Sequence, residues 1–329
     1  MNGNRKQPKT LQDAVVYFSN PDNSLAYMTV LRWPDGVVSC PTCGRKDVVF
    51  LHNQRKWQCK TTHPKRQFSA KVGTIFEDSP IALEKWLVVV WMISNCRNGV
   101  SSYEIARTIG VTQKSAWFML HRIRLGLQDV SGGKLGGPSG PVEIDETFIG
   151  GKARYMHKNR LQRLKRINNG MHGGKGKTVV IGALERGGKV KARVIVNRKF
   201  PAVHSAVRDF VETGSAIMTD EFNGYCDLNT EYDHKVINHL EKYVDGQVHT
   251  QGMENFWSLL KRGLGGTYVA VEPFHLFRYV DEQAFRFNNR KEGRRVIPDS
   301  ERFDIAMSQI IGKRLTYAEL TGKVGETAF

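Results

Sequence analysis

Three of the five cysteines lie within twenty residues of one another, and this clustering limits the possible fold more than any other feature of the chain. Cys40 and Cys43 form a C-x2-C pair, and the glycine after it supplies a turn that lets both thiolates face one ion. Cys59 follows after fifteen intervening residues, and His63 after three more. Thiolates and imidazole are preferred ligands of Zn²⁺, so the spacing predicts one structural zinc in a small β ribbon at residues 36–80.

Spacing alone leaves two residues for the fourth ligand. A second C-x2-C pair is usual in such ribbons, and His52 is a conceivable substitute for His63. The odd number of cysteines and the polar N-terminal segment MNGNRKQPKT argue against both a disulfide framework and secretion.

The charge of the chain indicates its kind of partner. Lys and Arg number 49 against 32 Asp and Glu in 329 residues, which gives a net charge of +17. Such basicity favours a nucleic-acid partner, although a merely basic enzyme is the alternative. The longest apolar run, residues 86–93, is eight residues long, against the ~20 that a membrane span needs. We therefore expect a cytoplasmic, nucleoid-associated protein with no membrane contact.

Residues 81–130 are helical in pattern and contain a candidate helix-turn-helix. Ser101 and Glu104 form a capping-box signature, Gly110 ends the first helix, and Thr112 can cap a second. An ordinary pair of packed helices is the alternative, but polar residues at the start of the second helix favour DNA recognition. The predicted DNA contacts on this helix are Gln113, Lys114, Ser115, Arg122 and Arg124.

Two segments interrupt the regular pattern. Residues 131–140 contain five glycines and are typical of a linker. Residues 151–177 carry nine Lys or Arg and no acid, which favours contact with a nucleic-acid backbone over a solvated loop. The contacts predicted there are Lys158, Arg160, Arg163, Lys165 and Arg166.

The chain from 141 to 290 alternates between strand-like and helix-like runs, which predicts an α/β domain. The expected strands are 142–148, 178–184, 190–196 and 216–220, with a hairpin turn at 185–188 and a short strand near 235–238. The expected helices are 202–213, 253–262 and 273–289.

Three acidic residues in this domain are candidate metal ligands. Asp145 lies inside a strand, Asp220 ends another, and Glu254 lies early in a helix. A carboxylate in a buried strand is costly unless it has a positive partner. Two strand acids and one helix acid that converge form the usual cage for two Mg²⁺ ions in ribonuclease H-like enzymes.

Several stretches together carry a family resemblance: CPTCG with WQCK, SSYEIARTIGVTQKSAWFMLHRIR, VEIDETFIGGK, IMTDEFNGY and HTQGMENFWSLLKRG. The chain resembles DDE-type insertion-sequence transposases of the ISXO-like group. The resemblance implies a ribonuclease H-like, retroviral-integrase-like catalytic domain with a mixed sheet. It further implies that Asp145, Asp220 and Glu254 are the catalytic triad and that Lys261 is its associated lysine. The third position can also be Asn in this group, and Asn255 is adjacent to Glu254.

The expected protein is thus a DNA transposase of several domains. They are a leader at 1–35, the zinc ribbon, the helix-turn-helix, the linker, the catalytic domain and a helical tail at 291–329. Two Mg²⁺ or Mn²⁺ ions would support cleavage at the element ends and joining of the freed 3′-OH to target DNA, in a homodimer or higher oligomer. The alternatives are a DNA-binding regulator with an inactive nuclease fold and an endonuclease that does not join.

Overall fold

The computed structural model describes residues 8–129, 132–151, 159, 177–237 and 250–323. The chain divides into two compact units. The first unit combines residues 1–129 with 296–329, and the second comprises residues 130–295. No helix in the described part of the chain is both long and apolar enough to cross a membrane.

The first unit begins with two helices and a small sheet. Helix α1 (Leu11–Phe18) begins with a capping box between Thr10 and Asp13. Helix α2 (Pro21–Arg32), which the sequence analysis did not predict, begins with proline after the Asn20 cap. Strands β1 (Val48–Leu51), β2 (Lys56–Cys59) and β3 (Gln67–Phe68) then form an antiparallel sheet in the order β1-β2-β3.

Helix α3 (Leu83–Asn95) is the centre of the first unit, because eight of its residues are buried. It packs against α1, α2 and α5, and also against α10 (Asp299–Ser308), which comes from the far end of the sequence. Phe303 of α10 lies 5.1 Å from the ring of Trp91 and 5.5 Å from that of Phe18. The predicted C-terminal tail therefore contributes to the core of the first unit, together with the short helix α11 (Tyr317–Leu320).

Helices α4 (Ser102–Ile109) and α5 (Gln113–Leu127) follow α3 and pack against each other. The predicted capping box of Ser101 and Glu104 is confirmed, as is the cap that Thr112 provides for α5. Gly110 ends α4 with a left-handed φ of +63°, a conformation that glycine adopts without steric cost. Local sequence signals thus define both helices and the short turn between them.

The second unit is built on a five-stranded mixed sheet. Its strands are β4 (Val142–Ile149), β5 (Thr178–Glu185), β6 (Val190–Ile195), β7 (Ala216–Asp220) and β8 (Asp233–Ile237), in the order β6-β5-β4-β7-β8. The β5–β6 hairpin is confirmed, and β4 pairs antiparallel to β5 but parallel to β7. Strand β8 pairs parallel to β7.

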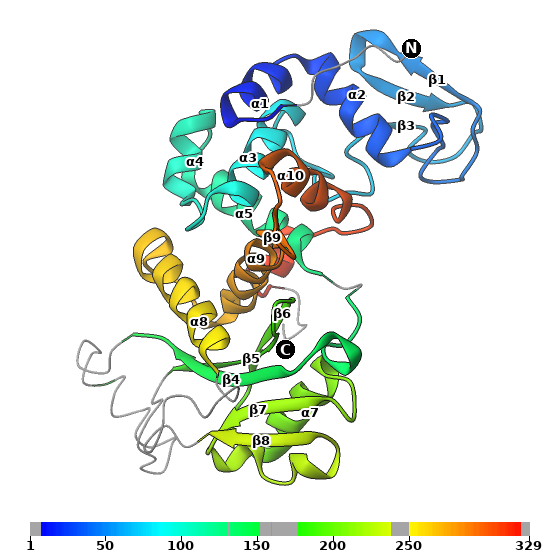
Figure 1. The fold of residues 1–329 in the computed structure, drawn as a ribbon. Coiled ribbons are helices and arrows are strands. Elements are labelled where there is room, and N and C mark those ends of the chain that lie inside the picture. The colour runs from blue at the N-terminus through cyan, green and yellow to red at the C-terminus, as the bar shows by residue number, and fades with distance from the viewer. Residues whose placement is uncertain (1–7, 130–131, 152–158, 160–176, 238–249, 324–329) are drawn as a thin grey trace. The chain divides into compact units, whose positions relative to one another are not determined.

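Helices cover both faces of this sheet (Figure 1). Helix α7 (Phe200–Phe210) covers one face with a core that includes Val142 and Ile144. Helices α8 (Gln251–Gly263) and α9 (Leu276–Asn288) cover the other, with a second core around Val180 and Trp257. Alternate residues of β4 therefore face different helices, because successive side chains of a strand point to opposite faces. The short strands β9 (Lys291–Glu292) and β10 (Arg295–Val296) follow α9.

Part of the predicted glycine-rich linker packs against the second unit. The N–H of Leu135 donates to the carbonyl of Phe210 (2.7 Å), and the N–H of Gly137 donates to Ser215 Oγ (2.9 Å). A Cβ at Gly136 would lie 2.4 Å from Ser215 Oγ, and the φ there is +93°. Gly136 is thus required because a larger residue would clash with Ser215. The glycine content of this segment predicted a flexible linker, whereas the structure shows close packing at this position.

Candidate zinc centre and catalytic carboxylates

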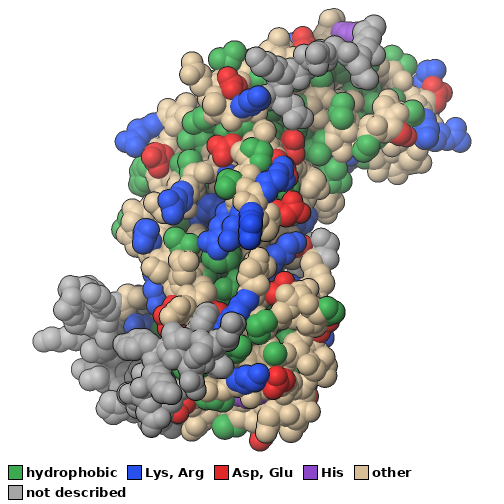
Figure 2. Space-filling view, viewed as in Figure 1, with side chains coloured by type: hydrophobic (Ala, Val, Ile, Leu, Met, Phe, Trp, Pro, Cys, Tyr) green, Lys and Arg blue, Asp and Glu red, His purple; other side chains and the backbone are tan. Residues whose placement is uncertain are grey.

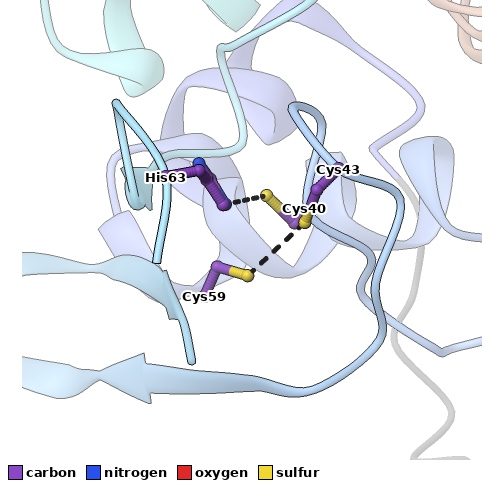
Figure 3. A group of neighbouring side chains, drawn as sticks. All are labelled: Cys40, Cys43, Cys59 and His63. Carbon is purple, nitrogen blue, oxygen red and sulfur yellow. Dashed lines mark hydrogen bonds between the residues drawn. The ribbon is translucent and has the colours of Figure 1, made fainter. Parts of the chain in front are cut away.

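The four predicted zinc ligands converge in the first unit (Figure 3). The ligand atoms of Cys40, Cys43, Cys59 and His63 all lie within 4.8 Å of one another. Cys40 Sγ is 3.5 Å from His63 Nε2, and Cys43 Sγ is 3.6 Å from Cys59 Sγ. Three sulfur atoms and one imidazole nitrogen at this separation match a closed tetrahedral zinc site, so the structure supports the predicted structural zinc.

The geometry also selects His63 over His52. The Nδ1 of His63 lies 2.7 Å from the carbonyl oxygen of Pro64, which turns Nε2 towards the sulfurs. His52 lies in the short 3₁₀ turn after β1, with its ring against Phe50, and is not in the cluster. Although burial raises the pKa of the Cys59 thiol, hydrogen bonds that include one from His63 outweigh it and lower this pKa to about 6. The site thus favours the thiolate form that binds zinc.

Asp145 and Asp220 lie on neighbouring parallel strands of the second unit. The pairing of β4 with β7 sets Val142 opposite Ile217 and Glu143 opposite Met218. Continued by two residues, this register would place the two aspartates opposite each other, and the charge of Asp220 does act on Asp145. Because both are an even number of residues from the Glu143–Met218 pair, their side chains leave the same face of the sheet.

The surroundings of Asp145 combine burial with like charge. Burial raises the pKa of Asp145 most, and the charges of Glu146 and Asp220 add to it, so that the pKa is about 7. Two donors oppose the shift: the backbone N–H of Glu146 (2.8 Å) and Trp257 Nε1 (3.0 Å). A divalent cation would relieve the repulsion between the carboxylates, and carboxylate oxygens are ligands that Mg²⁺ prefers. The donor set therefore fits the predicted metal.

This pKa predicts an unusual dependence of stability on pH. The pKa of Asp145 in the folded chain is about 7, above the ordinary aspartate value of 3.8, so ionisation of this group opposes folding. Its contribution to the free energy of unfolding should fall as pH rises from about 4 to about 7. Without divalent ions, Asp145→Asn should raise the melting temperature by several degrees at pH 8, because each pKa unit is worth ~1.4 kcal/mol.

The difference should shrink towards pH 5, where the native carboxyl is protonated. Added Mg²⁺ should stabilise the unchanged protein at pH 8 and have little effect on the variant. Thermal melting across this pH range measures both effects, and Asp233→Asn, at the exposed start of β8, is the control. Equal melting temperatures of the Asp145→Asn variant and the unchanged protein at pH 8 would contradict the assigned electrostatics.

Helix α8 is held against the sheet by contacts that the sequence analysis missed. Buried Glu143 accepts hydrogen bonds from the N–H groups of Gly252 (2.8 Å) and Met253 (3.1 Å) and pairs with Arg186 at 3.0 Å. Gly182 pairs with Asp145, and a Cβ there would lie 2.5 Å from Met253 Cε. The sequence contained a signal for Glu143, because it lies two residues before Asp145 in the predicted strand and therefore on the same face of the sheet.

Glu254 and Lys261 lie on the flank of α8 that carries Trp257, because they are three and four residues from it. Both are exposed. Asn255 lies roughly 160° around the helix from Trp257 and lines a cavity with Arg290. In the described residues, only the Cys and His group brings three or more Cys, His, Asp or Glu side chains close enough to share one ion. Glu254 therefore lies on the same flank of α8 as Trp257, which contacts Asp145. Its carboxylate is not close enough to those of Asp145 and Asp220 for the three to share one ion in this structure.

Glu146 lies on the opposite face of β4, as strand alternation predicts. Its carboxylate pairs with Arg198 and accepts a hydrogen bond from the hydroxyl of Tyr225 (2.6 Å). The Arg198 guanidinium lies 3.6 Å from the centre of the Phe222 ring. Glu146 is thus engaged on the α7 side of the sheet.

Comparison with known proteins adds an independent observation. Residues 137–288 match the profile of the ISXO2-like transposase domain, and residues 20–61 match the transposase zinc-ribbon domain. An uncharacterized transposase-like protein of Haemophilus influenzae is 30% identical over 102 residues, which cover 82% of that protein and 31% of this chain. The chain belongs to the ISXO2-like transposase family.

A second relative extends the similarity along the chain. An uncharacterized protein in transposable element ISH50 of Halobacterium salinarum is 28% identical over 246 residues, which cover 71% of this chain and 80% of that protein. In the present chain, the match to the ISXO2-like transposase domain includes all five strands of the mixed sheet and helices α7 to α9. The zinc-ribbon match includes the three cysteines and ends two residues before His63.

Three of the predicted DNA contacts lie at the start of α5. Lys114 is exposed, with its ammonium 4.8 Å from the centre of the Tyr317 ring. Gln113 donates to Ser102 Oγ (2.9 Å), and Ser115 Oγ lies 2.9 Å from Thr112 Oγ1. The polar start of α5 is thus partly accessible, and Lys114 is its accessible cation.

The placement of Arg122 and Arg124 corrects the sequence analysis. Both are buried, at 3% and 1% exposure, so their guanidinium groups are not presented at the surface. Arg122 donates to the carbonyl of Glu77 and lies against the rings of Trp86 and Phe118. It lies three residues after buried Met119, so it shares the core-facing stripe of α5. A count of positive charge does not reveal which face of a helix carries it.

The predicted contacts in the basic insertion, Lys158, Arg160, Arg163, Lys165 and Arg166, lie outside the described residues.

Proposed function

We propose that this chain is the transposase of an insertion sequence, which cuts DNA at the element ends and joins the freed 3′-OH to target DNA. The observation that carries the proposal is that Asp145 and Asp220 lie on adjacent parallel strands, inside the segment that matches the ISXO2-like transposase domain. Glu254 on α8 is the proposed third carboxylate. The proposed oligomer is a homodimer or larger assembly on DNA at the nucleoid.

The proposed roles follow from the contacts of each side chain. Asp145 is oriented by the N–H groups of Glu146 and Trp257, and Asp220 Oδ1 by the N–H of Phe222 at 3.1 Å. Two Mg²⁺ or Mn²⁺ ions bound by these acids would activate the attacking oxygen and stabilise the leaving oxygen. Lys261, two helical turns after Glu254, would hold a phosphate of the bound strand.

One assay separates this proposal from its two alternatives. Purified protein is incubated with Mg²⁺, a linear DNA that carries the inverted repeats flanking the gene, and a supercoiled plasmid. We expect both cleaved ends and joined products, and neither in EDTA. Cleavage without joining would identify an endonuclease, and binding without cleavage would identify a regulator.

Recognition of the element ends is proposed for α4 and α5 as a helix-turn-helix, aided by the basic insertion. Lys114→Ala should weaken binding of end DNA and lower the slope of log K against log salt by about one, as loss of one phosphate contact predicts. Fluorescence anisotropy at several salt concentrations measures both. Lys323→Ala removes an exposed charge elsewhere in the first unit and is the control. An unchanged slope for Lys114→Ala would make α4 and α5 an ordinary helix pair.

A further inference from the structure

A cavity of about 310 Å³ lies at the start of α8, in the second unit. Its walls come from the turn between β5 and β6, from the first residues of α8 and from the end of α9. Leu184 and Phe287 provide apolar wall, whereas Gln251 and Asn255 provide carboxamides. The volume is at the small end of the ~300–1,000 Å³ usual for ligand sites. The cavity can therefore hold one small molecule or one nucleotide, but not a DNA duplex.

The charge of the cavity is positive. Its one carboxylate, Glu143, is paired with Arg186 and accepts two N–H groups of α8. Two exposed cations, Arg290 and Lys291, complete the wall. Arg290 is oriented by the Phe287 ring, whose centre lies 3.8 Å from its guanidinium. Figure 2 shows the Lys and Arg side chains of one face of the molecule in blue.

We infer that this cavity binds a single unpaired nucleotide of the DNA substrate. Its phosphate would contact Arg290 and Lys291, since a guanidinium and an ammonium are the usual phosphate partners. Its base would contact Gln251 and Asn255, because a carboxamide both donates and accepts and so matches the edge of a base. An unpaired nucleotide is required because a paired base is stacked within a duplex, which the cavity is too small to admit.

The position of the cavity connects it to the proposed active site. Asn255, which lines the cavity, is adjacent in sequence to Glu254. Glu143, which also lines it, accepts hydrogen bonds from the N–H groups at the start of the same helix. A strand bound there would have its neighbouring nucleotides beside the start of α8. The inference rests on the proposed function for its substrate, and it assigns Asn255 to DNA binding.

The test is a comparison of two DNA probes in the absence of divalent ions. We expect the full chain to bind a fluorescent duplex with a three-nucleotide unpaired end about tenfold more tightly than the blunt duplex, as one good base contact predicts. Arg290→Ala/Lys291→Ala and Asn255→Ala should each remove most of this preference. Arg186 is kept, because its loss would leave Glu143 buried without its cation.

A matched double variant, Lys199→Ala/Lys235→Ala, removes two positive charges from residues that do not line the cavity and should keep the preference. Equal binding of both probes by the unchanged protein, or a preference retained by Arg290→Ala/Lys291→Ala, would overturn the inference. So would displacement of the DNA by micromolar deoxynucleoside monophosphate, because the ligand would then be a free nucleotide. The assay needs no chemistry, so its result is independent of whether the chain cleaves or joins DNA.

Discussion

Replacement of Asp145 or Asp220 by alanine should reduce cleavage of element ends by at least about a thousandfold. Each change removes a carboxylate from the proposed metal site, and metal stabilisation of the transition state is worth several kcal/mol, with each ~1.4 kcal/mol equal to tenfold in rate. Binding of end DNA should be retained, because it is proposed to depend mainly on the first unit. The substitution removes a negative charge near the phosphates, so any change in binding should be a slight strengthening. Single-turnover cleavage with Mg²⁺, measured beside anisotropy on the same preparation, gives both quantities.

The control for these variants is Asp233→Ala, an exposed acid at the start of β8. It should cleave at a rate close to that of the unchanged protein. Thermal melting shows whether each variant is folded. Cleavage by folded Asp145→Ala within tenfold of the unchanged rate would remove Asp145 from the proposed site.

Loss of a zinc ligand should have the second large effect. Cys43→Ser should release the metal and unfold the small sheet of β1 to β3, because structural zinc contributes ~10–16 kcal/mol of apparent binding free energy in small domains. Elemental analysis should find about one zinc per chain in the unchanged protein, as one four-ligand site requires. Binding of end DNA should weaken with the loss of the ribbon.

Further variants test which histidine binds the zinc. His63→Cys should keep the zinc, since a fourth thiolate completes the same tetrahedron, whereas His63→Ala should lose much of it. His52→Ala and Cys226→Ser lie outside the cluster and should keep the metal. Zinc lost from His52→Ala but retained by His63→Ala would contradict the assigned geometry.

Signals that are local in sequence predicted much of the fold. The capping box at Ser101 and the β5–β6 hairpin each depend on a few adjacent residues, and the structure has both. Packing of α10 against α3 joins residues some two hundred positions apart, and no local pattern encodes it. Helix α2 was missed because its apolar residues have no clear helical stripe. The prediction that Arg122 contacts DNA was wrong because it used the charge of the residue and not its position on the buried face of α5.

The candidate site shows the same division. Spacing was enough for the three cysteines of the zinc cluster, whereas the choice of His63 over His52 needed the geometry. For the acids, the sequence suggested the residues but not the parallel pairing of β4 with β7, which brings the strands of Asp145 and Asp220 side by side. The role of Gly182 could not be predicted from the sequence. Its lack of a side chain leaves space for Met253 and Trp257, which are distant in sequence.

The third carboxylate is the part of the proposal that one measurement tests most directly. Glu254 shares the Trp257 flank of α8, whereas the adjacent Asn255 lines the cavity beside Arg290. The measurement is strand transfer with Mg²⁺ at saturating DNA by Glu254→Ala and Asn255→Ala proteins. We expect Glu254→Ala to bind end DNA but to lose strand transfer by at least about a thousandfold, and Asn255→Ala to lose no more than about tenfold. An active Glu254→Ala protein beside an inactive Asn255→Ala protein would contradict the account and move the third catalytic position by one residue.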